Sequence, residues 1–292
     1  MPKQLREYYR PADWKTAQEI LARQDLHAAP LFCPTRPLAP EDWPMEAGVD
    51  LSRLGLDSIK EEDGFIKLGV LVSLQAIVES DLLNSRFHAI LNHCAHFCGA
   101  LGMRNRANVG GLLIDQSGPC ELLLALMVLE ALVMVRTRTG ALRPVPLSEF
   151  IGGKAKLAPG EVAGEVRIPV PVASGKTTSG EVLMRVARTS LDQAIVAIVA
   201  CVEVEDHAAK TVRLAISGAS PLPERMEPIE KLLTGKSLRP ELLENAAASS
   251  QSWAHPVGDF RGSAEYRAAM AGTLLRRVLL AAWKAASSLE TS

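Results

Sequence analysis

The feature that most constrains the fold is a nearly all-apolar run from Leu122 to Val135, in which Glu130 is the single charged residue. The run is too short to cross a bilayer, which takes about 20 apolar residues in a helix. It has the length of a buried helix that leads directly into a strand. The sequence therefore predicts a soluble protein with a helix covered on all sides at its centre.

Composition agrees with a protein that folds around sizeable cores. The chain has 292 residues, of which 48% are hydrophobic, and this suffices for one large domain or two to three smaller ones. The net charge is −1 and no long basic run occurs, which argues against nucleic acid or a membrane surface as partner. The N-terminus has no apolar signal segment. Five cysteines without a framework spacing fit the cytoplasm.

The first half of the chain indicates two α/β lobes. Asp13 is placed to cap a short helix, and strands are expected at 28–32 and 49–51, which together predict a small βαβ unit. A second pattern begins near Ile59. It comprises a hairpin at 59–68, helices after Leu74, a hairpin at 132–145 and a strand at 161–170.

The second half indicates a separate α+β unit. Residues 172–180 are small and polar and form the expected linker. Three strands are expected at 181–188, 194–204 and 212–217, followed by helices from Glu227 onward. The last helix, 264–286, has an apolar stripe with Arg276 and Arg277 on its solvent side. The predicted domains are thus 1–58, 59–171 and 181–292.

A glycine-bearing stretch, 101–111, lies between an amphipathic helical segment and the apolar run. The stretch reads Leu-Gly-Met-Arg-Asn-Arg-Ala-Asn-Val-Gly-Gly and is expected to form a polar loop. Exposed amides of such a loop can hold an anion, because glycines let the backbone approach a ligand closely. The alternative is a plain turn between two packed helices.

Cysteines and histidines cluster just before this stretch, at His93, Cys94, His96 and Cys98. Both cysteines fall on the apolar stripe of the helix, where a thiol behaves as a small hydrophobic group. A metal or cluster would need Cys33 or Cys120 nearby in the fold, so no metal site is predicted. No nucleophile, zinc-protease or Walker motif occurs, and no catalytic residue is assigned.

Six sequence blocks, in order along the chain, resemble the FAD-binding medium subunit of molybdenum hydroxylases, the xanthine dehydrogenase and carbon monoxide dehydrogenase group. The most diagnostic block is Met-Arg-Asn-Arg-Ala-Asn-Val-Gly-Gly at 103–111. The other blocks are Tyr9-Arg10-Pro11, Val49-Asp50-Leu51, residues 68–73, the set Arg185, Arg188 and Asp192, and residues 259–267. Each block is weak alone, and their order makes the resemblance specific.

The resemblance implies an α+β fold, with a two-lobed FAD-binding region of the vanillyl-alcohol-oxidase type before a smaller antiparallel-sheet-plus-helices domain. It also implies an oxidoreductase subunit that passes electrons from iron–sulfur clusters through FAD to an external acceptor. The partners would be a molybdopterin-binding large subunit and an iron–sulfur small subunit carrying [2Fe-2S] clusters, in a dimer of heterotrimers. Molybdopterin and the clusters would belong to those partners.

The same resemblance places the FAD site on two segments, both of which depart from the family pattern. In the second segment, Val109, Gly110 and Gly111 match the family's glycine motif, but Asn108 replaces a hydroxyl residue and Leu112 replaces an asparagine. In the first segment, Cys33, Pro34 and Thr35 stand where the family has Gly-Gly-Thr. Pro34 has no N–H for a phosphate. Arg36 is either a direct phosphate partner that compensates for this loss or a solvated loop arginine.

Two further residues are candidates for the flavin site by the same resemblance. Glu121 stands where the family has an aspartate near the cofactor, and Arg185 matches a cationic residue near the flavin ring. The ordinary alternatives are a first-turn helix carboxylate for Glu121 and a surface strand arginine for Arg185. Two functions therefore remain open, a flavin-linked electron carrier and a flavin-free structural subunit of the same kind of complex.

Overall fold

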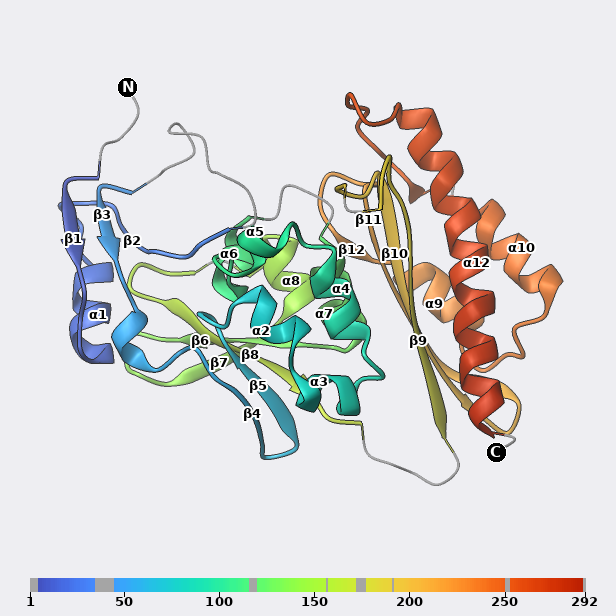
Figure 1. Ribbon diagram of the computed structural model, residues 1–292, viewed down its shortest axis with the longest axis horizontal. Helices are drawn as coiled ribbons and strands as arrows, with labels where there is room; N and C mark the ends of the chain where they lie inside the picture. Colours follow the sequence, from blue (N-terminus) through green and yellow to red (C-terminus); the bar gives the residue numbers. More distant parts are fainter. Residues whose placement is uncertain are drawn as a thin grey trace. The chain divides into compact units, whose positions relative to one another are not determined.

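The computed structural model describes residues 5–34, 45–115, 120–155, 157–171, 177–190, 192–249 and 253–290. The chain divides into two compact units, each assembled from separate stretches of sequence (Figure 1). The first unit comprises Met1–Ala76, Leu101–Gln116 and Ala131–Val170, and the second comprises Ile77–Ala100, Ser117–Glu130 and Pro171–Ser292. The predicted boundaries at 58, 171 and 181 stay a prediction.

The first unit begins with the predicted βαβ arrangement. Strands β1 (Glu7–Tyr9), β3 (Ala47–Val49) and β2 (Ala28–Pro30) pair in parallel in that order. Helix α1 (Trp14–Leu21) is capped as predicted, because the Asp13 side chain accepts a hydrogen bond from the Thr16 N–H at 2.9 Å. Its buried face, Ala17 and Leu21, shares a hydrophobic cluster with the small sheet.

A five-stranded antiparallel sheet forms the rest of this core, in the order β4-β5-β8-β6-β7. The Asp63-Gly64 turn joins β4 (Ile59–Glu62) to β5 (Phe65–Gly69), as the sequence predicts. The other strands are β6 (Leu132–Arg136), β7 (Leu142–Pro146) and β8 (Val162–Pro169). Short helical elements complete this part of the chain, namely η2 (Ser52–Leu54), α2 (Leu74–Val78) and α8 (Leu147–Ile151).

Residues 101–111 are not the polar loop that the sequence predicts. Leu101–Arg104 form helix α5, and Val109–Ile114 form helix α6. Gly110 and Gly111 lie inside the first turn of α6, and both are buried. The prediction was wrong because the glycines are used for close packing, and neither has a positive φ.

The second unit is built on an antiparallel sheet, β12-β11-β10-β9. The strands are β9 (Thr178–Val186), β10 (Val196–Glu205), β11 (Ala208–Ser217) and β12 (Glu224–Arg225). Alternate residues of β10, such as Ile198, Ala200 and Val202, join the main hydrophobic cluster with the last helix. The intervening residues Val199 and Cys201 are also buried. Both faces of this sheet are therefore covered, which explains why β10 is apolar almost throughout.

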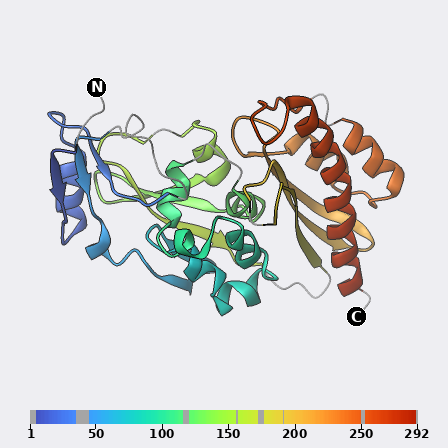
Figure 2. The same cartoon turned by 45° about the horizontal axis from the view of Figure 1, so that its top comes forward.

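Helices cover the two faces of that sheet separately. The long α12 (Ala264–Glu290) runs along β9 and β10 in Figures 1 and 2, with α9 (Glu227–Leu233) against β11 and α10 (Pro240–Ala248) against α12. On the other face, α7 (Glu121–Val128) packs against β10 and β11 and also against α4 (Ile90–His96). Helix α3 (Asp81–Arg86) precedes α4. Every residue of α7 is buried, as the apolar run predicts.

Among the described helices, none is both long and apolar enough to cross a membrane. The α+β class predicted from the sequence is confirmed, with a two-lobed region followed by an antiparallel sheet covered by helices.

Candidate functional site

The two segments predicted to bind phosphate lie together in the first unit and are hydrogen-bonded to each other. Asn108 caps α6, and its Oδ1 accepts hydrogen bonds from the N–H of Gly111 at 2.8 Å and of Cys33 at 3.3 Å. The N–H of Asn108 in turn donates to the Cys33 carbonyl at 3.0 Å. The side chain that the sequence offers to a cofactor thus joins two parts of the chain that lie seventy-five positions apart.

The next amides of α6 also have partners within the protein. The N–H of Val109 donates to the Val72 carbonyl at 3.1 Å, and the N–H of Gly110 donates to the Val70 carbonyl at 2.7 Å. These bonds tie the start of α6 to the chain just after β5. The first-turn N–H groups of a helix are normally the ones left for a ligand or a capping group. At α6 the chain satisfies them itself.

Glycine is required at positions 110 and 111 by the close approach of the first segment. A Cβ on Gly110 would lie 2.5 Å from Cδ1 of the Phe32 ring. A Cβ on Gly111 would overlap the Cys33 carbonyl oxygen and would lie 2.6 Å from the Pro34 nitrogen. The glycines therefore allow a close approach, as the motif predicts, but the approaching group is a segment of the same chain where the motif predicts a ligand.

The remaining members of the first segment are only partly placed. Cys33 is a free, half-buried cysteine, and Pro34 is half-buried beside it. Thr35 and Arg36 lie outside the described residues, so the predicted phosphate contact of Arg36 stays a prediction. Leu112, where the family has asparagine, is 1% exposed and lies in the core.

Glu121 and Arg185 meet in the second unit, as a buried ion pair. The Nε of Arg185 donates to Oε1 of Glu121 at 2.8 Å, and the two side chains are 11% and 2% exposed. Arg185 also donates to the carbonyls of Ser190 and Asp192, and its guanidinium lies 4.4 Å from the Phe97 ring centroid. The surface-arginine alternative for Arg185 is therefore wrong.

The environment of Glu121 perturbs its ionisation. Burial raises the pKa of the Glu121 carboxyl, and the Arg185 charge and hydrogen bond partly oppose this rise. Glu121 is also the first residue of α7, in agreement with the alternative of a first-turn carboxylate. An arginine held by this many acceptors fixes the end of β9 against α7 and α4.

Three buried thiols lie near this ion pair. The Sγ atoms of Cys98 and Cys120 are 3.3 Å apart, and the hydrogen bond with the Cys120 thiol, together with burial, raises the pKa of Cys98 well above its ordinary value. Cys94, one turn before Cys98, is fully covered. Within the described ranges, no group of three metal-ligating side chains forms. Packing is the role that these contacts support.

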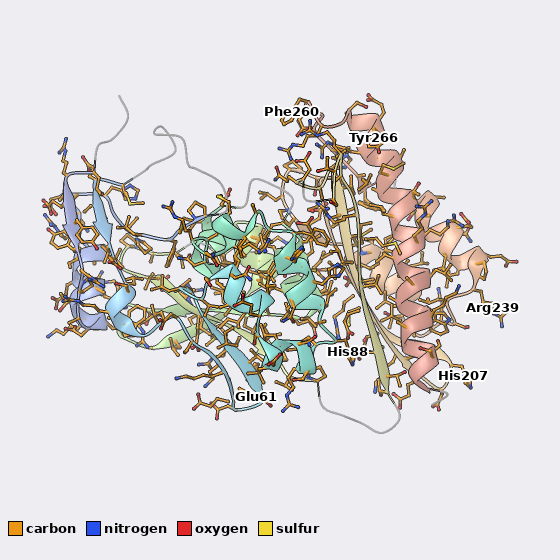
Figure 3. All side chains as sticks on the ribbon, viewed as in Figure 1. Glu61, His88, His207, Arg239, Phe260 and Tyr266 are labelled. Carbon is orange, nitrogen blue, oxygen red and sulfur yellow. The ribbon has the colours of Figure 1, made fainter. Side chains whose placement is uncertain are left out.

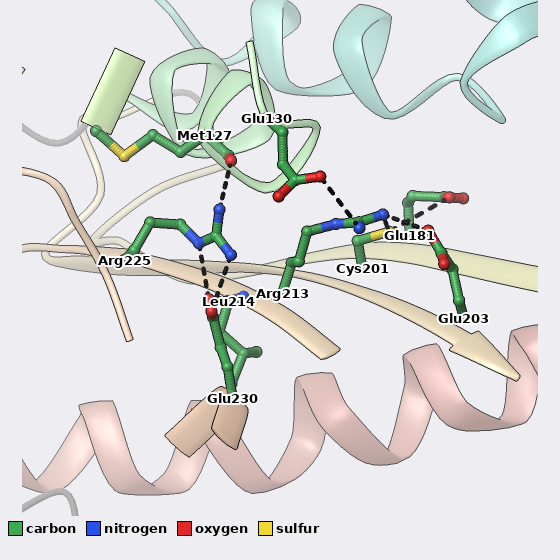
Figure 4. Close-up of polar contacts among 9 residues, drawn as sticks. All are labelled: Met127, Glu130, Glu181, Cys201, Glu203, Arg213, Leu214, Arg225 and Glu230. Atoms are coloured by element: carbon green, nitrogen blue, oxygen red, sulfur yellow. Dashed lines mark hydrogen bonds and ion pairs between the residues drawn. The ribbon is translucent and has the colours of Figure 1, made fainter. Parts of the chain in front are cut away.

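A second polar cluster, which was not predicted from the sequence, links β11 and β12 to α7 and α9 (Figure 4). Arg225 forms an ion pair with Glu230 at 2.7 Å and donates to the Met127 carbonyl near the end of α7 at 3.1 Å. Arg213, on β11, contacts Glu203, Glu130 and the Cys201 thiol. The available signal in the sequence was Glu203, a charged residue inside the largely apolar β10. Only the pairing of β10 with β11 shows that it meets Arg213.

A third polar contact joins the segment between α3 and α4 to strand β9. His88, labelled in Figure 3, lies between α3 and α4, and its Nδ1 lies 2.7 Å from Oε2 of the buried Glu181 on β9. The hydrogen bond to Glu181 raises the pKa of His88 above its ordinary value of 6.5. The ion pair therefore strengthens as His88 takes up a proton.

Comparison with known proteins identifies the class of this fold. Residues 3–171 match the model of the FAD binding domain in molybdopterin dehydrogenase. Residues 181–282 match the model of the CO dehydrogenase flavoprotein C-terminal domain. The two models follow one another in the order that the sequence blocks predict, and together they span nearly the whole chain.

Individual proteins similar to this chain belong to the same class as the matched family models. The chain is 26% identical over 284 residues to the carbon monoxide dehydrogenase medium chain of Afipia carboxidovorans, covering 94% of this chain and 95% of that one. It is 25% identical over 220 residues to the glyceraldehyde dehydrogenase medium chain of Sulfolobus acidocaldarius, covering 75% and 76%. A solved carbon monoxide dehydrogenase from Hydrogenophaga pseudoflava has a chain that superposes with a TM-score of 0.85 at 25% identity, covering 98% and 100%.

These findings define an oxidoreductase subunit of the molybdopterin dehydrogenase type. The chain belongs to the family of FAD-binding medium subunits of molybdenum hydroxylases, of which the carbon monoxide dehydrogenase medium chains are members.

The described residues do not fit the pyrophosphate of FAD in the predicted way. A pyrophosphate held without metal needs N–H donors from glycine loops or helix N-termini. The N–H groups of residues 108–111 all donate to acceptors of this chain. The segment that carries Cys33 and Pro34 lies directly on the two glycines.

Proposed function

We propose that this chain is the medium subunit of a molybdenum hydroxylase complex, bound to a molybdopterin-binding large subunit and an iron–sulfur small subunit. The observation that carries the proposal is the match of both family modules, in order, over nearly the whole chain. The similar chain from Afipia carboxidovorans is itself a carbon monoxide dehydrogenase medium chain. A dimer of heterotrimers is part of the same proposal.

Two roles within such a complex follow from the sequence. In the first, the subunit passes electrons from the partner's iron–sulfur clusters through FAD to an external acceptor, and family membership supports this role. In the second, the subunit holds the complex together without flavin. The specific observation that favours the second role is the occupation of the α6 amides by acceptors of this chain.

Co-expression tests the complex directly. The chain would be tagged and produced together with a molybdopterin-binding large subunit and an iron–sulfur small subunit from the same genome. The proposal expects all three chains to elute together in equal amounts on size exclusion. A large and small subunit that associate with each other and leave the tagged chain behind would refute it. Here the Arg276→Ala variant serves as a control, because Arg276 lies on the solvent side of α12, where it pairs with the exposed Glu244.

A further inference from the structure

The space over Gly110 and Gly111, in the first turn of α6, says more about this chain than its family does. A helix of six residues offers few free amides, and a ligand there must compete with capping groups of the protein. Asn108 is that capping group, and its Oδ1 accepts from both Gly111 and Cys33. The cap therefore uses the same donors that a phosphate would use.

The N–H groups of residues 108–111 all donate hydrogen bonds within the protein, so none of these four donors is open to a ligand. Asn108 donates to the Cys33 carbonyl, Val109 to Val72 and Gly110 to Val70, and Gly111 donates to the Asn108 side chain. The distances run from 2.7 to 3.1 Å, within the normal range for N–H···O bonds. Breaking such buried bonds to admit a ligand costs free energy that the ligand must return.

Steric contact closes the same position. The Phe32 ring stands over Gly110, and the Cys33 carbonyl with the Pro34 nitrogen stands over Gly111. Because even a single added Cβ would overlap these groups, a phosphate group cannot fit between them and the helix. Pro34 also brings no N–H of its own, and Leu112 brings hydrocarbon where the family has an amide.

We infer that residues 32–34 of this chain occupy the phosphate position over the α6 glycines, and that the protein is a flavin-free medium subunit. This inference deepens the proposed function, since it states which of the two roles the subunit performs in the complex. Because residues 32–34 fill this space, the FAD-binding domain keeps its fold without a cofactor. The two segments stabilise each other where a pyrophosphate would otherwise join them.

The affinity lost in this arrangement is large. Each charge-assisted hydrogen bond to phosphate is worth about 1.5–3 kcal/mol, which is roughly 10- to 100-fold in binding. Loss of two such bonds would weaken FAD by a factor of about 10² to 10⁴. We therefore expect the purified chain to carry no flavin and to show no saturable binding when titrated with micromolar FAD.

The experiment compares three forms of the full chain by FAD titration and by flavin release on denaturation. They are the wild type, the double variant Cys33→Gly/Pro34→Gly, and Pro159→Gly as a control at an exposed loop proline outside the position. The double variant restores one N–H, and two glycines let the backbone of residues 33 and 34 move away from α6, so its FAD affinity should rise by about tenfold or more. The control should match the wild type.

Each outcome decides the inference. Wild-type protein that carries stoichiometric FAD would overturn it. A double variant that melts as a folded protein but binds FAD no better than the wild type would overturn the assignment of the loss to residues 33 and 34. Co-purification with the partner subunits is measured separately, so failure of the complex and failure of the flavin-free inference are distinguishable.

Discussion

Substituting alanine for Gly111 tests whether the chain itself fills the position over α6. The new Cβ would overlap the Cys33 carbonyl oxygen and meet the Pro34 nitrogen at 2.6 Å. Both are backbone atoms, held by the hydrogen bonds between Cys33 and Asn108, so no side-chain rotation relieves the overlap. One of the two segments must move.

The magnitude follows from two opposing effects. Alanine in a helix is favoured over glycine by about 0.8–1 kcal/mol. Overpacking of a closely packed site costs about 1–3 kcal/mol, and more when backbone must shift. We therefore expect Gly111→Ala to lower the free energy of unfolding by about 2 kcal/mol. For Gly110→Ala, the atoms nearest the new Cβ belong to the Phe32 ring, and the added variant Phe32→Ala should recover part of its loss.

The assay is urea unfolding followed by circular dichroism. The free energies of unfolding are compared between variants that show the same linear dependence on urea concentration. Gly102→Ala is the matched control, because Gly102 lies in helix α5 with no atom near the added Cβ. The control should be neutral or stabilised by up to about 1 kcal/mol. If Gly111→Ala were as stable as Gly102→Ala, the segment around Cys33 would not lie on α6 and the reasoning would be refuted.

Two further predictions concern the Glu121–Arg185 and His88–Glu181 ion pairs of the second unit. Arg185→Met leaves the Glu121 carboxylate buried and unpaired, so unfolding at pH 7 should cost about 3–5 kcal/mol less, and adding Glu121→Gln should restore most of the loss. Because the pKa of Glu121 is raised, the defect should shrink as pH falls through that pKa; a defect that grew would count against this account. The hydrogen bond to Glu181 raises the pKa of His88 above 6.5. The stability that the pair adds to the folded protein is therefore fully present below pH 6.5 and is lost as pH rises through the raised pKa. Urea midpoints of wild type and His88→Gln should differ more in mildly acidic than in alkaline buffer, and an equal difference at both would reject the pair.

Local signals in the sequence were enough to predict much of the fold. The Asp13 cap, the Asp63-Gly64 turn and the apolar run of α7 are each set by neighbouring residues, and the structure contains all three. The order of the family blocks then supplied the arrangement of the modules. Strand ends shifted by a few residues, for example at β3, because pairing partners decide where a strand stops.

The site could be predicted only in part. The sequence predicts that the backbone at Gly110 and Gly111 approaches a phosphate, whereas in the structure residues 32–34 of the same chain lie against these glycines. The contact between Cys33 and Asn108 joins residues far apart in the chain, so no local pattern contains it. Short helices such as α5 and α6 also depend on tertiary packing more than on propensity.

Flavin content of the assembled complex tests the central claim most directly. The chain would be isolated with the large and small subunits that the proposal assigns to it, and the flavin released on denaturation would be compared with the amount of this chain. We predict a stable complex of all three subunits with molybdenum and iron on the partners and essentially no FAD on this chain. One FAD for each copy of the chain would contradict the account.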